Sequence, residues 1–76
     1  MRSEAQVRFR ELLIEARKKA NLTQVELSVR LNRPQSFVSK YERGERRLDV
    51  VEFHEVATAL GVNPVQFLAR LYREIS

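Results

Sequence analysis

The hydrophobic positions along the chain recur at the three- and four-residue spacing of helices. Within residues 50–60, for example, the apolar positions Phe53, Val56, Ala57 and Leu60 lie on one side of a helix. No stretch alternates apolar and polar residues as a half-buried strand does, and glycine and proline occur only twice each. The pattern therefore predicts an all-α fold.

Capping residues predict where each helix begins. A Ser, Thr, Asp or Asn side chain accepts hydrogen bonds from the first free backbone N–H groups, and Glu or Gln three residues later can return the bond. Such pairs are Ser3 with Gln6, Thr23 with Glu26, Asp49 with Glu52, and Asn63 with Gln66. Gly44 and Gly61 suit left-handed C-terminal caps, and apolar spacing resumes after Pro34. We expect helices at about residues 4–19, 24–31, 35–42, 50–60 and 64–74.

Length and composition narrow the possibilities further. The apolar faces fit one core, so residues 1–76 are expected to form a single compact domain. Cysteine is absent and His54 is the one histidine, so neither a metal site nor another cofactor is expected. Asp49, Glu52 and Glu55 cluster, but capping accounts for the first two, and no catalytic set or phosphate-binding glycine loop occurs; no enzyme is predicted. Without a leader after Met1 or a long apolar run, a cytoplasmic protein outside the membrane is expected.

Charge is distributed unevenly along the chain. Residues 1–47 carry twelve Lys and Arg against six acids, a net charge of +6, whereas residues 48–76 carry −2. The first part is therefore suited to a polyanion such as nucleic acid.

The two central helices are joined by only three residues, Asn32, Arg33 and Pro34. So short a link makes the pair cross steeply, as in a helix-turn-helix, and asparagine tolerates the positive φ of such a turn. An α-helix fits the DNA major groove, where Gln reads adenine and Lys reaches guanine or phosphate. The predicted exposed face of the second helix of the pair is Gln35, Ser36, Ser39, Lys40 and Arg43.

At these residues the chain resembles the phage repressor and Cro family of XRE-type regulators. The resemblance covers about residues 9–68, and its most specific parts are Thr23-Gln24-Val25-Glu26-Leu27 and Tyr41-Glu42-Arg43-Gly44. It implies a five-helix lambda-repressor-like domain that binds double-stranded DNA and regulates transcription. The sequence departs from the family pattern at Asn32 (usually glycine), Ser28 (usually alanine) and Pro34 (usually a hydroxyl cap).

The resemblance also assigns roles to residues. Gln24 would contact a phosphate and brace Gln35, and Arg17 would pair with Glu42 between the first and third helices. Arg43 and the following loop would approach the DNA backbone. The pattern leaves Phe37 either packed against the second or fourth helix or touching a thymine methyl. The expected DNA-binding residues are Gln24, Arg33, Gln35, Ser36, Ser39, Lys40, Arg43, Arg46 and Arg47.

The last predicted helix has an apolar arc wider than one small chain is expected to bury. Domains of this size bury only about 60% of their unfolded surface, so a partner subunit is a common support. We expect a symmetric homodimer that places two recognition helices about 34 Å apart on a palindromic operator. The predicted interface residues are Phe67, Leu68, Leu71, Tyr72 and Ile75.

Other functions remain open from the sequence. The same fold serves as an adaptor or as an antitoxin that binds a toxin protein, although the basic face favours DNA. RNA binding is less favoured because no exposed aromatic platform is evident. From the length of 76 residues, no ligand-sensing domain is expected. A phage repressor-like protein, a restriction–modification controller and an antitoxin all fit.

Overall fold

A computed structural model describes residues 3–76. It contains five helices and, within that range, no strand, as the apolar pattern predicts. The third and fifth helices extend one residue beyond the predicted ends. The helices are α1 (Glu4–Lys19), α2 (Gln24–Leu31), α3 (Gln35–Arg43), α4 (Val50–Leu60) and α5 (Pro64–Ile75).

All four predicted N-caps are confirmed, because the side-chain oxygens of Ser3, Thr23, Asp49 and Asn63 accept backbone N–H bonds. The return bond forms only where the third residue is a glutamate, at Glu26 and Glu52. A carboxylate is a stronger acceptor than the neutral amide oxygen of Gln6 or Gln66. Gly44 and Gly61 have positive φ and end α3 and α4.

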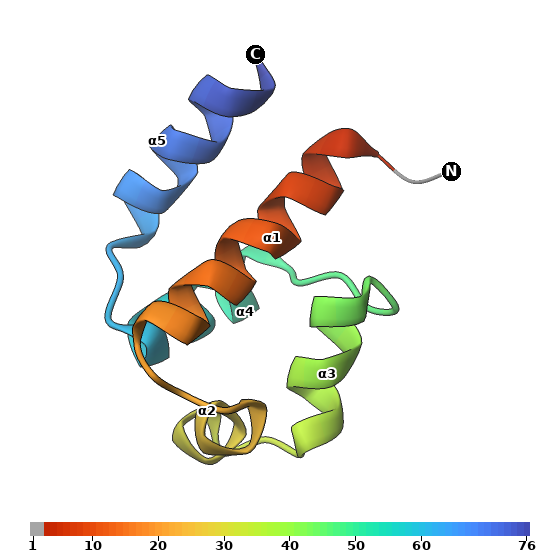
Figure 1. Ribbon diagram of the computed structural model, residues 1–76, viewed down its shortest axis with the longest axis vertical. Coiled ribbons are helices and arrows are strands. Elements are labelled where there is room, and N and C mark those ends of the chain that lie inside the picture. Colours follow the sequence, from red (N-terminus) through yellow and green to blue (C-terminus); the bar gives the residue numbers. More distant parts are fainter. Residues whose placement is uncertain (1–2) are drawn as a thin grey trace.

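The five helices surround one hydrophobic core (Figure 1). The two helices α3 and α5 both contact α1, and in the view of Figure 1 they lie on opposite sides of it. Phe9, Phe53 and Phe67 join α1, α4 and α5 through ring centroids 5.3–5.9 Å apart. On α2, Leu27 is buried in the core, whereas Val25 is exposed.

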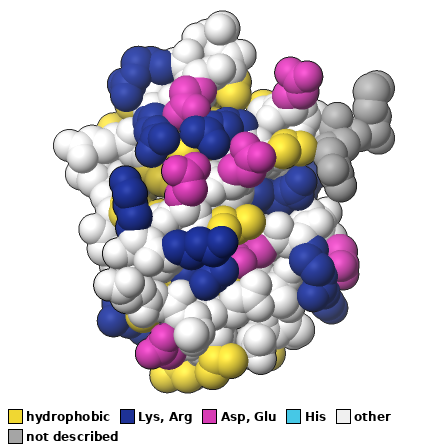
Figure 2. Space-filling model, viewed as in Figure 1, with side chains coloured by type: hydrophobic (Ala, Val, Ile, Leu, Met, Phe, Trp, Pro, Cys, Tyr) yellow, Lys and Arg dark blue, Asp and Glu magenta, His cyan; other side chains and the backbone are white. Residues whose placement is uncertain are grey.

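An ion pair links α5 to α1. Glu74 accepts hydrogen bonds from Arg8 Nε at 2.6 Å and from Arg70 Nε at 2.9 Å. Arg8 also reaches Glu15, and Figure 2 shows acidic and basic side chains interspersed over this face. Part of the positive charge of residues 1–47 is therefore neutralised within the chain. Among residues 3–76, no helix combines the length and the apolar character needed to cross a bilayer.

Candidate nucleic-acid interface

The turn between α2 and α3 is built on Asn32. Its φ and ψ of 55° and 44° lie in the left-handed region, which asparagine tolerates better than most residues. The backbone N–H groups of Asn32 and Arg33 both reach the carbonyl oxygen of Ser28. The buried Ser28 hydroxyl donates to the Val25 carbonyl at 2.6 Å, so the serine leaves no unpaired polar group here. The turn is thus closed by backbone bonds without glycine.

Helix α3 has one buried side and one exposed side. Phe37, Val38 and Tyr41 are at most 7% exposed and belong to the core. The opposite side is polar, and its residues are exposed apart from the half-buried Ser39, whose hydroxyl bonds to the Ser36 carbonyl. The core therefore fixes the rotation of α3 about its axis. The outward residues are Gln35, Ser36, Ser39, Lys40 and Arg43, as the sequence predicts.

Three polar side chains tie α3 to the two preceding helices. Arg17 donates to both carboxylate oxygens of Glu42, at 2.8 and 3.1 Å, and to the Leu22 carbonyl. The bond to Glu42 raises the pKa of Arg17 above its usual value. The ion pair expected from the resemblance is thus present. Gln24 also donates to the Glu42 carboxylate, at 2.9 Å; its expected contacts with Gln35 and with a phosphate stay predictions.

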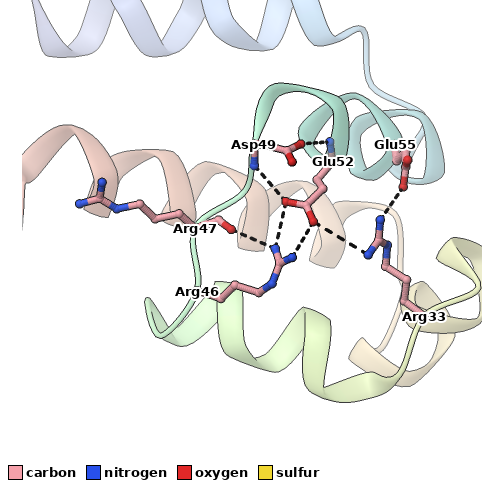
Figure 3. Close-up of polar contacts among 6 residues, drawn as sticks. All are labelled: Arg33, Arg46, Arg47, Asp49, Glu52 and Glu55. Carbon is pink, nitrogen blue, oxygen red and sulfur yellow. Dashed lines mark hydrogen bonds and ion pairs between the residues drawn. The ribbon is translucent and has the colours of Figure 1, made fainter.

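Glu52 organises two of the predicted DNA-binding arginines (Figure 3). Arg46 donates to both of its carboxylate oxygens, at 3.0 and 2.6 Å, and the Asp49 backbone N–H donates at 3.0 Å. Arg33 lies 3.9 Å from the same carboxylate and bonds to Glu55 at 3.2 Å. The Arg46 guanidinium and the Asp49 N–H lower the pKa of Glu52 from 4.5 to about 2.

The same two arginines cover the ring of Phe37. The guanidinium carbons of Arg33 and Arg46 lie 4.4 and 4.7 Å from its centroid, within the range of a cation–π contact. Tyr41 contacts the ring edge-on at 5.7 Å. Phe37 is therefore a packed residue of the core. It also holds two cations beside the start and the end of α3.

The remaining basic residues of this face are more exposed. Arg43 pairs with Glu45 at 2.6 Å, but both side chains are more than half exposed, and such pairs contribute little to stability. Lys40 and Arg47 are exposed. In Figure 3 the Arg47 side chain points away from the Glu52 cluster. These cations can therefore turn toward a polyanion with little loss of internal bonding.

Helix α5 uses part of the predicted dimer interface within its own chain. Leu71 is buried, and Phe67 and Leu68 pack against the core, because α5 lies on α1 and α4. Tyr72 and Ile75 stay exposed, at 60% and 41%. Of the five predicted interface residues, only Tyr72 and Ile75 are therefore exposed within one chain.

Helices α2 and α3 cross steeply (Figure 1), α3 is anchored in the core, and its outward face is polar. These features define a helix-turn-helix DNA-binding protein. The family model described as helix-turn-helix matches residues 13–67. An XRE-family like protein from Pseudomonas syringae pv. tomato str. DC3000 is 46% identical, with a TM-score of 0.91 over 95% of this chain and 88% of that one.

Two further proteins are similar to this chain. The restriction–modification controller protein C.AhdI from Aeromonas hydrophila is 32% identical, with a TM-score of 0.74 over 82% of this chain and 94% of that one. The uncharacterized HTH-type transcriptional regulator y4dJ of Sinorhizobium fredii is 38% identical over 68% of each chain. The chain belongs to the XRE-type helix-turn-helix family of DNA-binding transcriptional regulators.

Sequence reasoning missed the second role of Glu52. The capping pattern identified its bond to Asp49, which the structure confirms. Arg46 lies in the loop before α4, and Arg33 lies in the turn before α3. The spacing of residues along the sequence does not predict that both arginines approach Glu52. A glutamate six residues after an arginine, across a predicted turn, was the only available signal.

Proposed function

We propose that this protein regulates transcription by inserting α3 into the major groove of an operator. One observation carries the proposal: α3 buries its whole apolar side and presents Gln35, Ser36 and Lys40 outward. In the major groove, a glutamine amide pairs with adenine through two bonds and a lysine reaches guanine or phosphate. Ser39 and Arg43 extend the same face toward flanking bases and phosphates.

Phosphate contacts would flank the reading face on both sides. Arg33 lies before α3 and Arg46 after it, and Glu52 holds both beside Phe37. Because their conformations are fixed before DNA arrives, less side-chain entropy is lost on binding. Arg47 and Gln24 complete the proposed backbone contacts.

The operator would be palindromic because the protein would bind as a symmetric homodimer. The exposed apolar residues of α5 are Val65, Tyr72 and Ile75, and helix α5 lies on the side of α1 opposite to α3 in Figure 1. Pairing α5 with a second copy would leave both α3 faces free. Half-sites about 34 Å apart follow from one turn of DNA.

The similarity to a restriction–modification controller makes control of a promoter by occupancy the regulatory mode to test first. The comparisons do not favour an adaptor or antitoxin role. In this proposal residues 1–76 act as one DNA-binding domain, and the protein works in the cytoplasm.

The test is selection of bound duplexes from a random DNA pool, followed by fluorescence anisotropy on the enriched site. We expect an inverted repeat with two equivalent half-sites and an affinity at least about 10³-fold above that for random duplex. A pool that shows no enrichment, or an enriched site with a single half, would contradict the proposal.

A further inference from the structure

A cavity of about 160 Å³ lies between the beginning of α1, the end of α3 and the loop that follows α3. Its polar lining residues are Ser3, Gln6, Arg10, Tyr41, Arg46 and Arg47. Among residues 3–76, no acidic residue lines it. The cavity is therefore rich in hydrogen-bond donors and positive charge.

Two buried groups of this cavity lack partners. The Tyr41 side chain is 1% exposed, and its hydroxyl has no hydrogen-bond partner among residues 3–76. The same holds for the buried Nε of Arg10. Buried polar groups in native proteins are nearly always paired. Burial raises the pKa of the Tyr41 phenol, which keeps it protonated. Both groups therefore offer a proton to an acceptor.

Gly44 provides the room in which the Arg10 guanidinium lies. A Cβ atom at Gly44 would collide with Arg10 Nη1 and Cζ. The glycine also has a φ of +80° as the cap of α3, so its lack of a side chain serves two purposes.

The charges around the cavity are unbalanced. Arg46 is paired with Glu52, but within residues 3–76 neither Arg10 nor Arg47 has an acidic side chain in ion-pair range. An anion in the cavity would offset these two charges and would supply the acceptor that the Tyr41 hydroxyl and Arg10 Nε lack.

The size of the cavity limits the anion. Sites for drug-sized ligands measure about 300–1,000 Å³, which exceeds this volume. A single tetrahedral oxyanion fits it. Planar guanidinium groups are the preferred partners of phosphate oxygens, which they bind with two parallel bonds.

We propose that this cavity is a phosphate-binding site, in which Arg10 and Arg47 supply charge and Tyr41 donates a hydrogen bond. The phosphate comes either from the DNA backbone or from free inorganic phosphate. The DNA source rests on the proposed function, because the loop that lines the cavity also carries Arg46 and Arg47. It would extend the DNA-contacting surface from α3 to α1.

The first arm measures thermal unfolding in inorganic phosphate and in chloride at equal ionic strength. At ten times Kd, phosphate should raise the Tm of the wild-type protein by about 6–11 °C. The rise should be absent in Arg10→Gln and smaller in Tyr41→Phe. In chloride the Tyr41→Phe variant should be no less stable than wild type, because it removes an unpaired buried hydroxyl. Controls are Lys19→Gln, which removes one exposed charge from α1, and Thr58→Val, which removes one exposed hydroxyl from α4.

The second arm measures affinity for a mixed-sequence duplex across a range of chloride concentrations. If the site takes a backbone phosphate, Arg10→Gln weakens binding and lowers the slope of log affinity against log salt by about 0.9. Tyr41→Phe then weakens binding without changing the slope, since it removes no charge. If the site takes free phosphate alone, both variants bind the duplex as wild type does while the first arm stays positive.

The proposal is overturned if phosphate gives no Tm rise beyond chloride and Arg10→Gln behaves as Lys19→Gln in the second arm. Should that happen while wild type binds duplex, the proposed function stands and only the site falls. Conversely, a wild-type protein that binds no duplex but keeps the phosphate-dependent Tm rise retains the site and loses the proposed function.

Discussion

Helices α3 and α5 are both amphipathic, yet they leave opposite kinds of surface outside. Helix α3 buries three large apolar residues and exposes polar and basic ones. Helix α5 buries only Leu71 fully and exposes Val65, Tyr72 and Ile75. The first surface suits a polyanion and the second a further copy of the chain. The difference teaches that one small core can fix two exposed surfaces of unlike chemistry on different sides of α1.

The largest expected effect on operator affinity comes from a substitution in the exposed apolar surface of α5. Tyr72→Asp places a charge in the proposed dimer interface and should give monomers by sedimentation. Losing the second half-site should reduce operator affinity by about a hundredfold or more. Val29→Asp is the matched control, because Val29 is also exposed, at 73%, but lies on α2. A Tyr72→Asp protein that sediments like Val29→Asp would refute the proposed interface. Leu71 is unsuitable for this test, since it is buried within the chain.

The next effect comes from the reading face of α3. Gln35→Ala should cost about 1–3 kcal/mol on the selected operator and relax the preference at one base position. Anisotropy with single-base operator variants measures both. Gln66→Ala removes another exposed glutamine, on α5, and should change neither the affinity nor the base preference. Equal weakening on operator and random duplex would show that Gln35 does not read a base.

The third test concerns what holds the flanks of α3. Glu52→Gln removes the charge that Arg46 and Arg33 share and should destabilise the fold by about 1 kcal/mol. The pKa of Glu52 is lowered to about 2 in the folded chain, from 4.5. Its contribution is therefore complete above pH 4.5 and is lost as the pH falls toward 2. In urea unfolding, the gap between wild type and Glu52→Gln should close over that range; a gap that is constant with pH would disprove the assignment.

The smallest effect comes from a single exposed cation. Lys40→Ala should weaken binding to operator and random duplex alike if Lys40 contacts a phosphate. The slope of log affinity against log salt should fall by the amount expected for the loss of about one phosphate contact. Salt titrations by anisotropy, with Lys18→Ala as the control on α1, measure it. An unchanged slope would show that Lys40 does not contact a DNA phosphate.

The sequence predicts the helices well because their signals are local. Caps such as Thr23 and Asp49, and the left-handed Asn32, depend on backbone groups within a few residues. The outward face of α3 followed from the same periodicity. By contrast, Gln24 meets Glu42 eighteen residues away, and Glu52 meets Arg33 across the fold. These meetings depend on how the helices pack.

For the same reason, the sequence could not show how much of the apolar side of α5 is covered within its own chain. Helical spacing shows that Leu71 shares an apolar side with Tyr72 and Ile75, but not how much of that side α1 and α4 cover. The structure divides the stripe, with Leu71 inside and Tyr72 outside.

The central claim is that the polar side of α3 enters the groove of duplex DNA. Titrating isotope-labelled protein with the selected operator and following backbone amide resonances tests it most directly. The largest shifts should fall on Gln35, Ser36, Ser39 and Lys40. Shifts confined to α4 and α5, with α3 unchanged at saturation, would contradict the account.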